Sequence, residues 1–381
     1  MSFDVIIVGA GPAGSTAGKI LAKHGVNTLI VDSSTFPRPK ACGELVTNKT
    51  ANLISQIFQL DSNCTLYTKH SSKAAIFSKS TLLTETTSDY PFHFIKRENF
   101  DFSLIQSAIE SGAKFKDGHK VIDVDIVSNT VTFQNGDKER AEVIIGADGS
   151  LSCVAKKIYG RQLRYKKQMA IGISIKVSKE YANQKLCGAE YLNRPNVYFN
   201  VVDWGYGWVF PNEGYLNVGM AGLMYKNPDI RKKLNAFLKI LPIDFSKKIS
   251  FNSHPIPYGK RSIRTGHGNI LLIGDSAGFI EPVTGEGLYY AIKSAQIAAD
   301  TYLNNLGNDK FLYNYKNKCK YSFLKQLNQA FIARYLLYSK PIMPHALNRI
   351  GRSQKWTKGY MNVLSGERDY ISYIKEAFSI R

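Results

Sequence analysis

Hydrophobic and polar positions along this chain follow three different patterns. Through about residue 60, short apolar runs alternate with amphipathic segments, as in Val5–Val8 followed by a helical pattern over Ala13–His24. Strand-like alternation runs from about 65 to 95 and again from 169 to 221, and long helical patterns dominate after Gly285. This order predicts an α/β (α+β) fold with a Rossmann-like domain, an inserted antiparallel sheet and a C-terminal helical region.

The same patterns predict how the chain is divided. The Rossmann-like domain is expected to be discontinuous and to comprise residues 1–60, 96–160 and 255–300. The antiparallel sheet is expected to be built from residues 61–95 and 161–254, and residues 301–381 form the helical region.

A glycine-rich turn follows the first predicted strand. Gly9, Gly11 and Gly14 have GxGxxG spacing, and the predicted helix begins at Ala13. Such glycines permit a tight turn, a close approach of the backbone to a pyrophosphate, and close packing of helix on strand. The next apolar run ends at Asp32, whose carboxylate can accept hydrogen bonds from ribose hydroxyls. Strand, turn, helix and acid together predict a dinucleotide site.

Two later motifs distinguish FAD from NAD. VIIGADGS contains Ala147, Asp148 and Gly149, and NILLIGDSAG contains Gly274 and Asp275. A PVTGEG segment follows, with its glycine–acid–glycine run at Gly285, Glu286 and Gly287. The second carboxylate can hold a polyol, and bare backbone at the last two glycines can approach a flat ring. These features predict FAD, whereas a nicotinamide enzyme needs only the first motif.

The combination of motifs resembles a known group of flavoproteins. The three glycine motifs resemble the FAD-dependent oxidoreductases of the p-hydroxybenzoate hydroxylase fold. PRPKACGE (Pro37–Glu44) and YGWVFP (Tyr206–Pro211) are similar to P-x-x-K-x-C-G and Y-x-W-x-F-P of the geranylgeranyl reductase family. The resemblance spans about residues 3 to 300, and it implies that Arg97, before a helix, contacts the FAD.

One motif departs from that family. After the ADG motif the family continues S-x-V-R, but Ser152, Cys153 and Val154 are followed here by Ala155 and Lys156. The role of the missing arginine is expected to pass to the lysine at 156 or 157, which lacks a bidentate fork.

Cys42 is the candidate catalytic residue. It lies in a loop after Asp32, two residues from Lys40 and four from Arg38, and Gly43 follows it. Nearby cations favour the thiolate form of a cysteine. The resemblance implies that this loop, with Lys40, Cys42 and Gly43, protonates or positions an alkene during its reduction. The alternative is a small buried hydrophobic residue.

An aromatic segment is the candidate substrate wall. Tyr206, Trp208 and Phe210 alternate on a predicted strand that ends at Pro211, so the three rings project to one face. They could form the wall of a pocket for a long apolar substrate, or they could be ordinary sheet packing. The histidines are not in metal-ligand spacing, so no metal site is expected.

Charge is concentrated at the C-terminal end. The chain carries a net charge of +20, and residues 310–381 hold 14 Lys/Arg against 3 Asp/Glu, a net charge of +11. The pattern over Phe323–Tyr338 is helical and amphipathic. A basic amphipathic region is typical of a surface for anionic lipid, and a solvated helical cap is the alternative. No recognition motif indicates nucleic acid.

Cysteine usage and the N-terminus bear on location. Five cysteines, at 42, 64, 153, 187 and 319, are scattered and never spaced as CxxC, so neither a disulfide framework nor a zinc site is expected. The first core strand begins almost at Met1, which leaves no room for a signal peptide. We expect a cytoplasmic protein, with peripheral association on the inner face of the membrane as an option.

These observations favour an FAD-dependent reductase that saturates double bonds of a prenyl chain on a lipid or prenylated precursor. The expected electron donor is NADPH or a low-potential carrier. A monooxygenase or halogenase of the same fold is the first alternative. A non-catalytic flavin-bearing protein that binds membrane or nucleic acid is the second.

Overall fold

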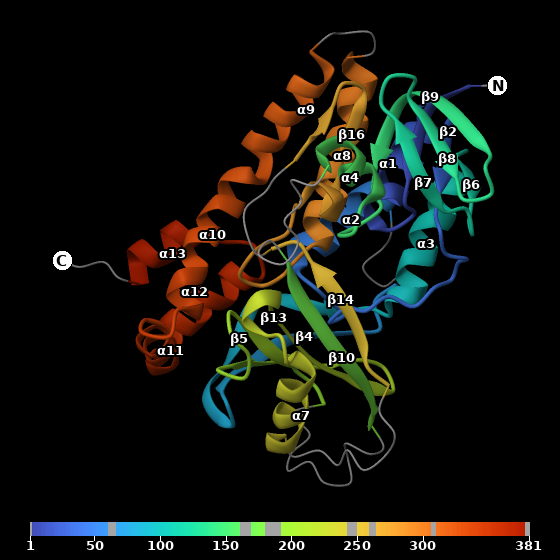
Figure 1. The fold of residues 1–381 in the computed structure, drawn as a ribbon. Coiled ribbons are helices and arrows are strands. Elements are labelled where there is room, and N and C mark those ends of the chain that lie inside the picture. The colour runs from blue at the N-terminus through green and yellow to red at the C-terminus, as the bar shows by residue number, and fades with distance from the viewer. Residues whose placement is uncertain are drawn as a thin grey trace.

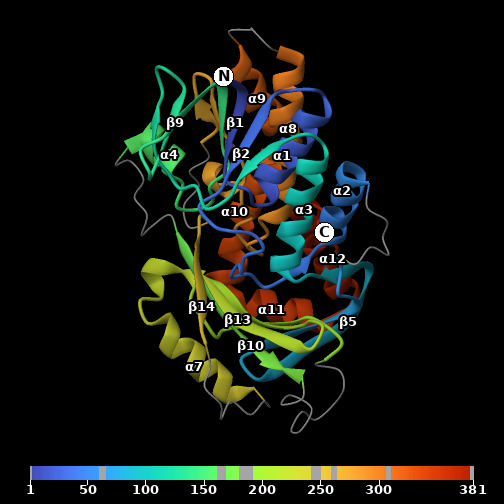
Figure 2. The ribbon, with the colours of Figure 1, turned by 90° about the vertical axis from the view of Figure 1, so that its right-hand side faces the viewer.

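The computed structural model describes residues 2–59, 66–160, 169–179, 192–241, 250–258, 264–305 and 310–377. Two eight-stranded sheets lie one above the other in Figure 1, and the C-terminal helices lie beside both. Helix α3 and the strands of the first sheet stand above the second sheet in the perpendicular view of Figure 2.

The first sheet is mainly parallel and has the order β15–β16–β9–β1–β2–β6, with β7 and β8 attached through β9. Its central strand β1 lies between β9 and β2, and Val5–Val8 are buried. A parallel strand buried on both faces needs a continuous apolar run, which these residues supply. The strands are β1 Phe3–Val8, β2 Thr28–Val31, β6 Lys114–Lys116, β7 Val121–Asp125, β8 Thr130–Phe133, β9 Lys138–Gly146, β15 Gly266–His267 and β16 Ile270–Leu272.

Three helices pack together beside this sheet. Helix α1 (Pro12–Lys23) packs against both α3 (Arg97–Glu110) and α8 (Leu288–Asn305). The helices α1 and α8 each follow a glycine motif, and the two motifs are about 270 residues apart in the sequence. The packing of α1 against α8 therefore brings distant parts of the chain together. Helices α2 (Asn48–Phe58) and α4 (Cys153–Tyr159) and the short 3-10 helix Gly274–Ala277 complete this part.

The second sheet has the order β14–β10–β13–β12–β11–β4–β5–β3 and is antiparallel except for β11 beside β4. Alternate residues of β4 enter different cores: Ala74 and Ile76 pack towards the C-terminal helices, and Ala75 and Phe77 pack towards α7 (Ile230–Ile240). The strands are β3 Leu45–Val46, β4 Lys69–Ser78, β5 Thr81–Phe94, β10 Ala170–Ser178, β11 Asn196–Phe199, β12 Gly205–Pro211, β13 Tyr215–Leu223 and β14 Asn252–Ile256.

The C-terminal helices cover one face of the second sheet. Helix α9 (Phe311–Cys319) continues through a π-helical turn into α10 (Lys325–Tyr338), which forms the long orange helix of Figure 1. Helices α11 (Met343–Arg352) and α12 (Gln354–Leu364) pack on β5, and α13 (Tyr370–Ala377) packs on α10 and α12. This region is therefore an integral layer of the fold.

The α/β fold class predicted from the sequence is confirmed. Two strands lie where the sequence did not place them: β3 and β14 both join the second sheet, although β3 falls within residues 1–60 and β14 extends past residue 254. The remaining division into domains stays a prediction. Among the described helices, none is both long enough and apolar enough to span a bilayer.

Candidate functional site

A cleft of about 590 Å³ lies between the two sheets. All three glycine motifs reach it, because each motif follows the carboxyl end of a strand of the first sheet. Nearly all the predicted cofactor-binding residues line it, namely Gly9, Gly11, Ala13, Asp32, Arg97, Ala147, Asp148, Gly149, Asp275, Gly285 and Gly287. Gly14, Gly274 and Glu286 do not line it.

The glycines of the first motif have two distinct roles. A Cβ on Gly14 would lie 1.8 Å from the Gly9 carbonyl oxygen, so this glycine lets helix α1 pack against the turn. A Cβ on Gly11 would meet only the Arg38 guanidinium, at 3.7 Å, so its bare backbone faces the cleft. No side chain caps the N-terminus of α1, and no acid lies in its first turn. These features fit a pyrophosphate held by backbone N–H groups.

Two carboxylates stand on the walls of the cleft. Asp32 accepts the backbone N–H groups of Ala10 at 2.8 Å and Ser34 at 2.9 Å, which fix it beside the turn. Asp275 is partly buried near Lys40, and burial raises the pKa of its carboxyl while Lys40 and Arg97 oppose that rise. Both residues line the cleft, and their predicted roles towards ribose and ribityl hydroxyls stay predictions.

Asp148 acts differently from the other predicted cofactor residues. Its carboxylate accepts the Ser152 hydroxyl at 2.5 Å and the Cys153 N–H at 2.6 Å, so it anchors the start of α4. Burial raises the pKa of this carboxyl. Neither Lys156 nor Lys157 lines the cleft, and Lys157 instead pairs with Asp123 at 2.8 Å. The two lysines that follow the ADG motif in place of the family's arginine therefore lie outside the cleft.

Cys42 has a different cation from the ones predicted. Arg97 lies near enough to the Cys42 thiol for that thiol to help raise the pKa of Arg97, and the Glu44 N–H donates to the Cys42 sulfur at 3.3 Å. Arg97 is itself held by two hydrogen bonds to Asp101, at 2.8 and 2.9 Å. Lys40 lies instead 2.6 Å from His254. The sequence missed the pair of Cys42 and Arg97 because 55 residues separate them.

Polar residues of the second sheet hold the Cys42 loop. Asn217 on β13 donates to the Cys42 carbonyl at 2.8 Å and to the Glu44 carboxylate at 3.1 Å, and it accepts from the Trp208 indole at 2.9 Å. Glu44 is 2% exposed and also accepts the Tyr215 hydroxyl at 2.7 Å. Glu44 was visible in the sequence motif, but its partners, about 170 residues away, were not.

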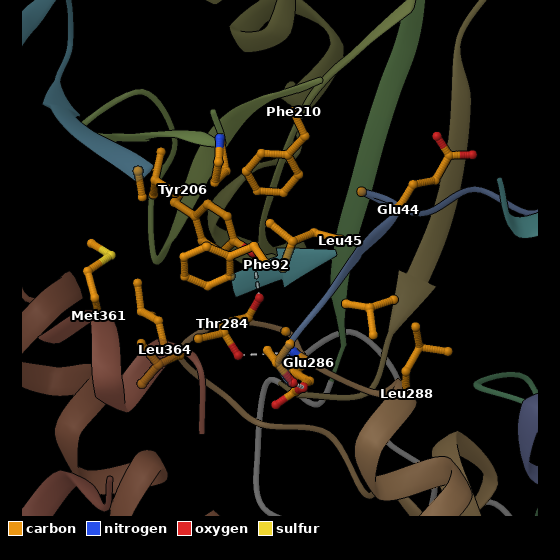
Figure 3. A pocket seen from close by; sticks show the side chains of 18 of the residues that line it. Glu44, Leu45, Phe92, Tyr206, Phe210, Thr284, Glu286, Leu288, Met361 and Leu364 are labelled. Carbon is orange, nitrogen blue, oxygen red and sulfur yellow. Dashed lines mark hydrogen bonds between the residues drawn. The ribbon is translucent and has the colours of Figure 1, made fainter. Parts of the chain in front are cut away.

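A second, apolar pocket of about 170 Å³ adjoins the cleft (Figure 3). Both cavities are lined by Cys42, Gly43, Tyr206, Phe210, Thr284, Gly285, Gly287 and Leu288. The far wall of the pocket comes from the C-terminal helices, at Tyr338, Tyr360, Met361 and Leu364. These four wall residues were not predicted from the sequence, because their pattern is that of any buried helix face.

The predicted aromatic wall is divided between the two cavities. Tyr206 and Phe210 line both, Trp208 lines the cleft alone, and Pro211 lines neither. A Cβ on Gly43 would lie 3.3 Å from the Phe210 ring, so Gly43 lets the Cys42 loop lie flat on that ring. The Tyr206 hydroxyl donates to the Thr284 carbonyl at 2.5 Å, which ties β12 to the segment before α8.

Glu286 belongs to the apolar pocket. Its carboxylate accepts the hydroxyls of Thr47 and Thr50 and lies 3.3 Å from Lys49. Glu44, which pairs with Lys176, also lines this pocket, so two paired acids lie at its edge, and both are labelled in Figure 3. Glu286 does not line the cleft, and its predicted contact with the cofactor stays a prediction.

The other described cysteines are not paired with one another. Cys153 and Cys319 are free thiols, and Cys64 and Cys187 lie outside the described residues. Within the described ranges, no group of three or more His, Cys, Asp or Glu residues is placed to hold a metal ion.

Comparison with known proteins agrees with this geometry. The family described as FAD binding domain matches residues 2–323. The chain belongs to that family. It is a flavoprotein and an FAD-dependent oxidoreductase, and the resemblance to geranylgeranyl reductases is confirmed by its relatives.

Three relatives of this flavoprotein show how far the similarity extends. An uncharacterized protein of Methanosarcina barkeri is 32% identical over 81% of this chain and 76% of its own. The chloroplastic geranylgeranyl diphosphate reductase of Oryza sativa is 29% identical over 80% of this chain and 67% of its own. The menaquinone reductase of Mycobacterium tuberculosis is 27% identical over 78% and 76%.

Solved structures share the fold of this flavoprotein. A geranylgeranyl bacteriochlorophyll reductase-like protein of Thermoplasma acidophilum, 20% identical, covers 98% of each chain with a TM-score of 0.82. A halogenase solved in complex with FAD, 17% identical, covers 96% of this chain and 83% of its own with a TM-score of 0.70. The fold is therefore shared by reductases and halogenases alike.

Proposed function

We propose that this flavoprotein saturates carbon–carbon double bonds of a prenyl chain on a lipid or prenylated precursor. FAD would occupy the cleft, and the prenyl chain would occupy the apolar pocket. One observation carries the proposal: the cleft with the pyrophosphate cradle and the apolar pocket share a wall at Cys42, Gly43, Tyr206 and Phe210. Because the two cavities adjoin at these residues, a flat ring in the cleft can lie next to an apolar chain in the pocket.

The residues at the shared wall suit this reaction. Bound FAD supplies the hydride chemistry, and an alkene that takes a hydride on one carbon needs a proton on the other. Cys42 lines both cavities, its sulfur accepts the Glu44 N–H near Arg97, and its thiol can hold that proton. The apolar pocket excludes water from the reacting carbons.

A long prenyl chain requires more room than the apolar pocket of about 170 Å³ alone offers. Tyr338 lines the apolar pocket and also lines a third cavity, of about 550 Å³, so the two cavities lie on either side of this residue or next to it. Lys79, Lys233 and Lys340 line this third cavity, together with Asp203. We propose that a long chain extends past Tyr338 towards this cavity.

Relatives support the substrate class. The names geranylgeranyl diphosphate reductase and menaquinone reductase both belong to proteins 27–29% identical to this chain. We propose NADPH or a low-potential carrier as electron donor. We also propose peripheral binding to the inner face of the membrane, since the basic C-terminal region exposes Tyr313, Tyr321 and Ile332 at 62, 81 and 68%.

The decisive experiment follows the flavin and the product together. The purified holoprotein is reduced anaerobically with dithionite and mixed with geranylgeranyl diphosphate, geranylgeraniol or menaquinone. Flavin reoxidation with a product that has gained two hydrogens per saturated bond is expected. Cys42→Ala should keep the fold and FAD but lower or divert this reduction, and unchanged turnover would remove Cys42 from the mechanism.

The alternatives give different results in the same experiment. Reduced flavin that reacts only with oxygen, and hydroxylates or halogenates an added aromatic compound, would indicate a monooxygenase or halogenase. A wild-type protein that takes up no FAD would contradict the proposal at its root.

A further inference from the structure

Lys40, His254 and Ser150 meet on the wall of the FAD cleft, although they come from three separate segments. The Lys40 ammonium nitrogen lies 2.6 Å from the Nε2 atom of His254, and the Ser150 hydroxyl oxygen lies 3.1 Å from the same atom. Lys40 and His254 both line the cleft, and Ser150 is buried next to it. The glycine motifs do not explain this cluster.

The contact between Lys40 and His254 allows a proton to move. When Lys40 is an ammonium, it donates to a bare Nε2. When Lys40 is a neutral amine, its lone pair can accept from an Nε2–H, and the Ser150 hydroxyl is a second acceptor for that hydrogen. The imidazole is only half-buried, so its other nitrogen can exchange a proton with water. The same geometry therefore serves both protonation states of Lys40.

The surrounding charges bring Lys40 into a useful range. Burial lowers the pKa of Lys40 to about 8, helped by Arg97 and Arg38, while Asp275 and Asp101 oppose the fall. Burial, with Lys40 and the two arginines, lowers the pKa of His254 to about 4. At neutral pH the pair therefore consists of a charged lysine and a neutral histidine. Above about pH 8, Lys40 loses its charge.

We infer that Lys40 is the titrating positive charge that the cleft presents to the flavin, and that His254 is the residue through which Lys40 exchanges its proton with solvent. Reduction of bound FAD adds two electrons and at least one proton, and the added negative charge favours protonated Lys40. When Lys40 starts as the neutral amine, it forms a new N–H bond with the hydrogen of His254 Nε2, and the imidazole regains a proton from water at Nδ1. The net change is one further proton taken from solvent.

This inference depends on bound FAD but not on the prenyl substrate. Its test is the midpoint potential of the flavin in the holoprotein, measured from pH 6 to pH 10 without any substrate. The wild-type potential is expected to fall by about 30 mV per pH unit at low pH and by up to about 60 mV per unit in a window that begins near pH 8, because one further proton accompanies each pair of electrons in that window. The window ends at the higher pKa that Lys40 has beside the reduced flavin. The reductant in the titration is dithionite.

Two lysine variants separate charge from titration. Lys40→Met should shift the equilibrium between oxidised and reduced flavin at least tenfold towards the oxidised form at pH 7, which lowers the midpoint potential by about 30 mV for two electrons. The potential of this variant should show no change of slope with pH. Lys40→Arg keeps a charge that does not titrate in this range, so it should retain the wild-type potential at pH 7 and also lose the change of slope. FAD affinity is measured for each, so that poor cofactor binding is recognised.

The histidine is tested by a rate. His254→Gln should keep the change of slope, because Lys40 still titrates, but should slow the proton uptake on flavin reduction at pH 9 about tenfold, as followed with an indicator dye. His267→Gln, at an exposed histidine on β15, is the matched control and should leave both unchanged. A wild-type slope that stays constant to pH 10, or unaltered proton uptake in His254→Gln, would overturn the respective role.

Discussion

The cleft proposed for FAD and the apolar pocket share one wall, yet they are built from the chain in opposite ways. The cleft is made by short motifs at the ends of parallel strands, where Gly11 offers bare backbone and Asp32 offers a fixed carboxylate. The pocket is made by single apolar side chains from widely separated elements, such as Phe92 of β5 and Met361 of α12. Recognition by backbone requires particular residues at particular spacings, whereas an apolar wall requires only bulk.

The largest effect is expected where the cleft depends on buried charge. Asp101 is 0% exposed and pairs with Arg97 and with Arg38, the latter at 3.3 Å. Asp101→Asn leaves two guanidiniums without their partner and should lower the free energy of unfolding by about 3–5 kcal/mol. Chemical denaturation of the apoprotein measures this. Asp89→Asn, at the exposed partner of Lys358, is the control and should change little.

The next prediction separates the cradle for FAD from the fold. Gly11→Ala places a methyl group in the cleft without meeting other protein atoms closer than 3.7 Å. The thermal midpoint of the apoprotein should be unchanged, while FAD affinity falls about tenfold to hundredfold from a clash of about 1–3 kcal/mol. Fluorescence titration with FAD measures the affinity.

Gly14→Ala is the matched variant for this test. Its Cβ would lie 1.8 Å from the Gly9 oxygen, so it should lower both stability and FAD affinity. Equal behaviour of the two variants would mean that the two glycines do not have separate roles.

The third prediction perturbs the pocket alone. Leu364→Trp fills part of the apolar pocket from α12 and does not touch the cleft. FAD affinity should stay at the wild-type value, while kcat/KM for a geranylgeranyl substrate falls about tenfold, or about 1.4 kcal/mol. Ile371→Trp, at an exposed position of α13, is the control. Loss of FAD affinity in Leu364→Trp would show that the two cavities are not independent.

The smallest effect is expected at the outer surface of the C-terminal region. Lys316 and Lys320 are exposed, and each reversal to Glu should weaken binding to anionic vesicles by about 1 kcal/mol, or about fivefold. Raised salt should reduce the difference, because it screens surface charge. Lys138→Glu, on β9, is the control. Unchanged vesicle binding would make the region a structural layer and no more.

Two other basic residues of the C-terminal region are already in ion pairs. Lys355 pairs with Glu376 at 3.0 Å and Lys358 pairs with Asp89 at 2.7 Å, so reversing either would also break an ion pair. Vesicle binding measured with those variants would mix a surface effect with a local structural one.

The sequence anticipated which glycine and acid residues line the cleft, but it did not anticipate the surroundings of Cys42. It placed Gly9, Gly11 and Asp32 at the cleft, because local strand–turn–helix geometry positions them whatever the rest of the chain does. It assigned Lys40 to Cys42 because the two are neighbours in sequence. The structure instead places Arg97 at the sulfur and turns Lys40 towards His254, a contact that spans 214 residues.

The sequence by itself determined the α/β class, the FAD-binding family and the backbone cradle. These follow from local periodicity and from positions where only a glycine leaves the backbone bare or only a carboxylate can accept the required hydrogen bonds. Only the tertiary structure decided that the basic C-terminal helices form the far wall of the pocket, that Tyr206 and Phe210 serve both cavities while Pro211 serves neither, and that His254 belongs to the cleft. Apolar side chains and single histidines bear no mark of their partners until long-range packing brings them together.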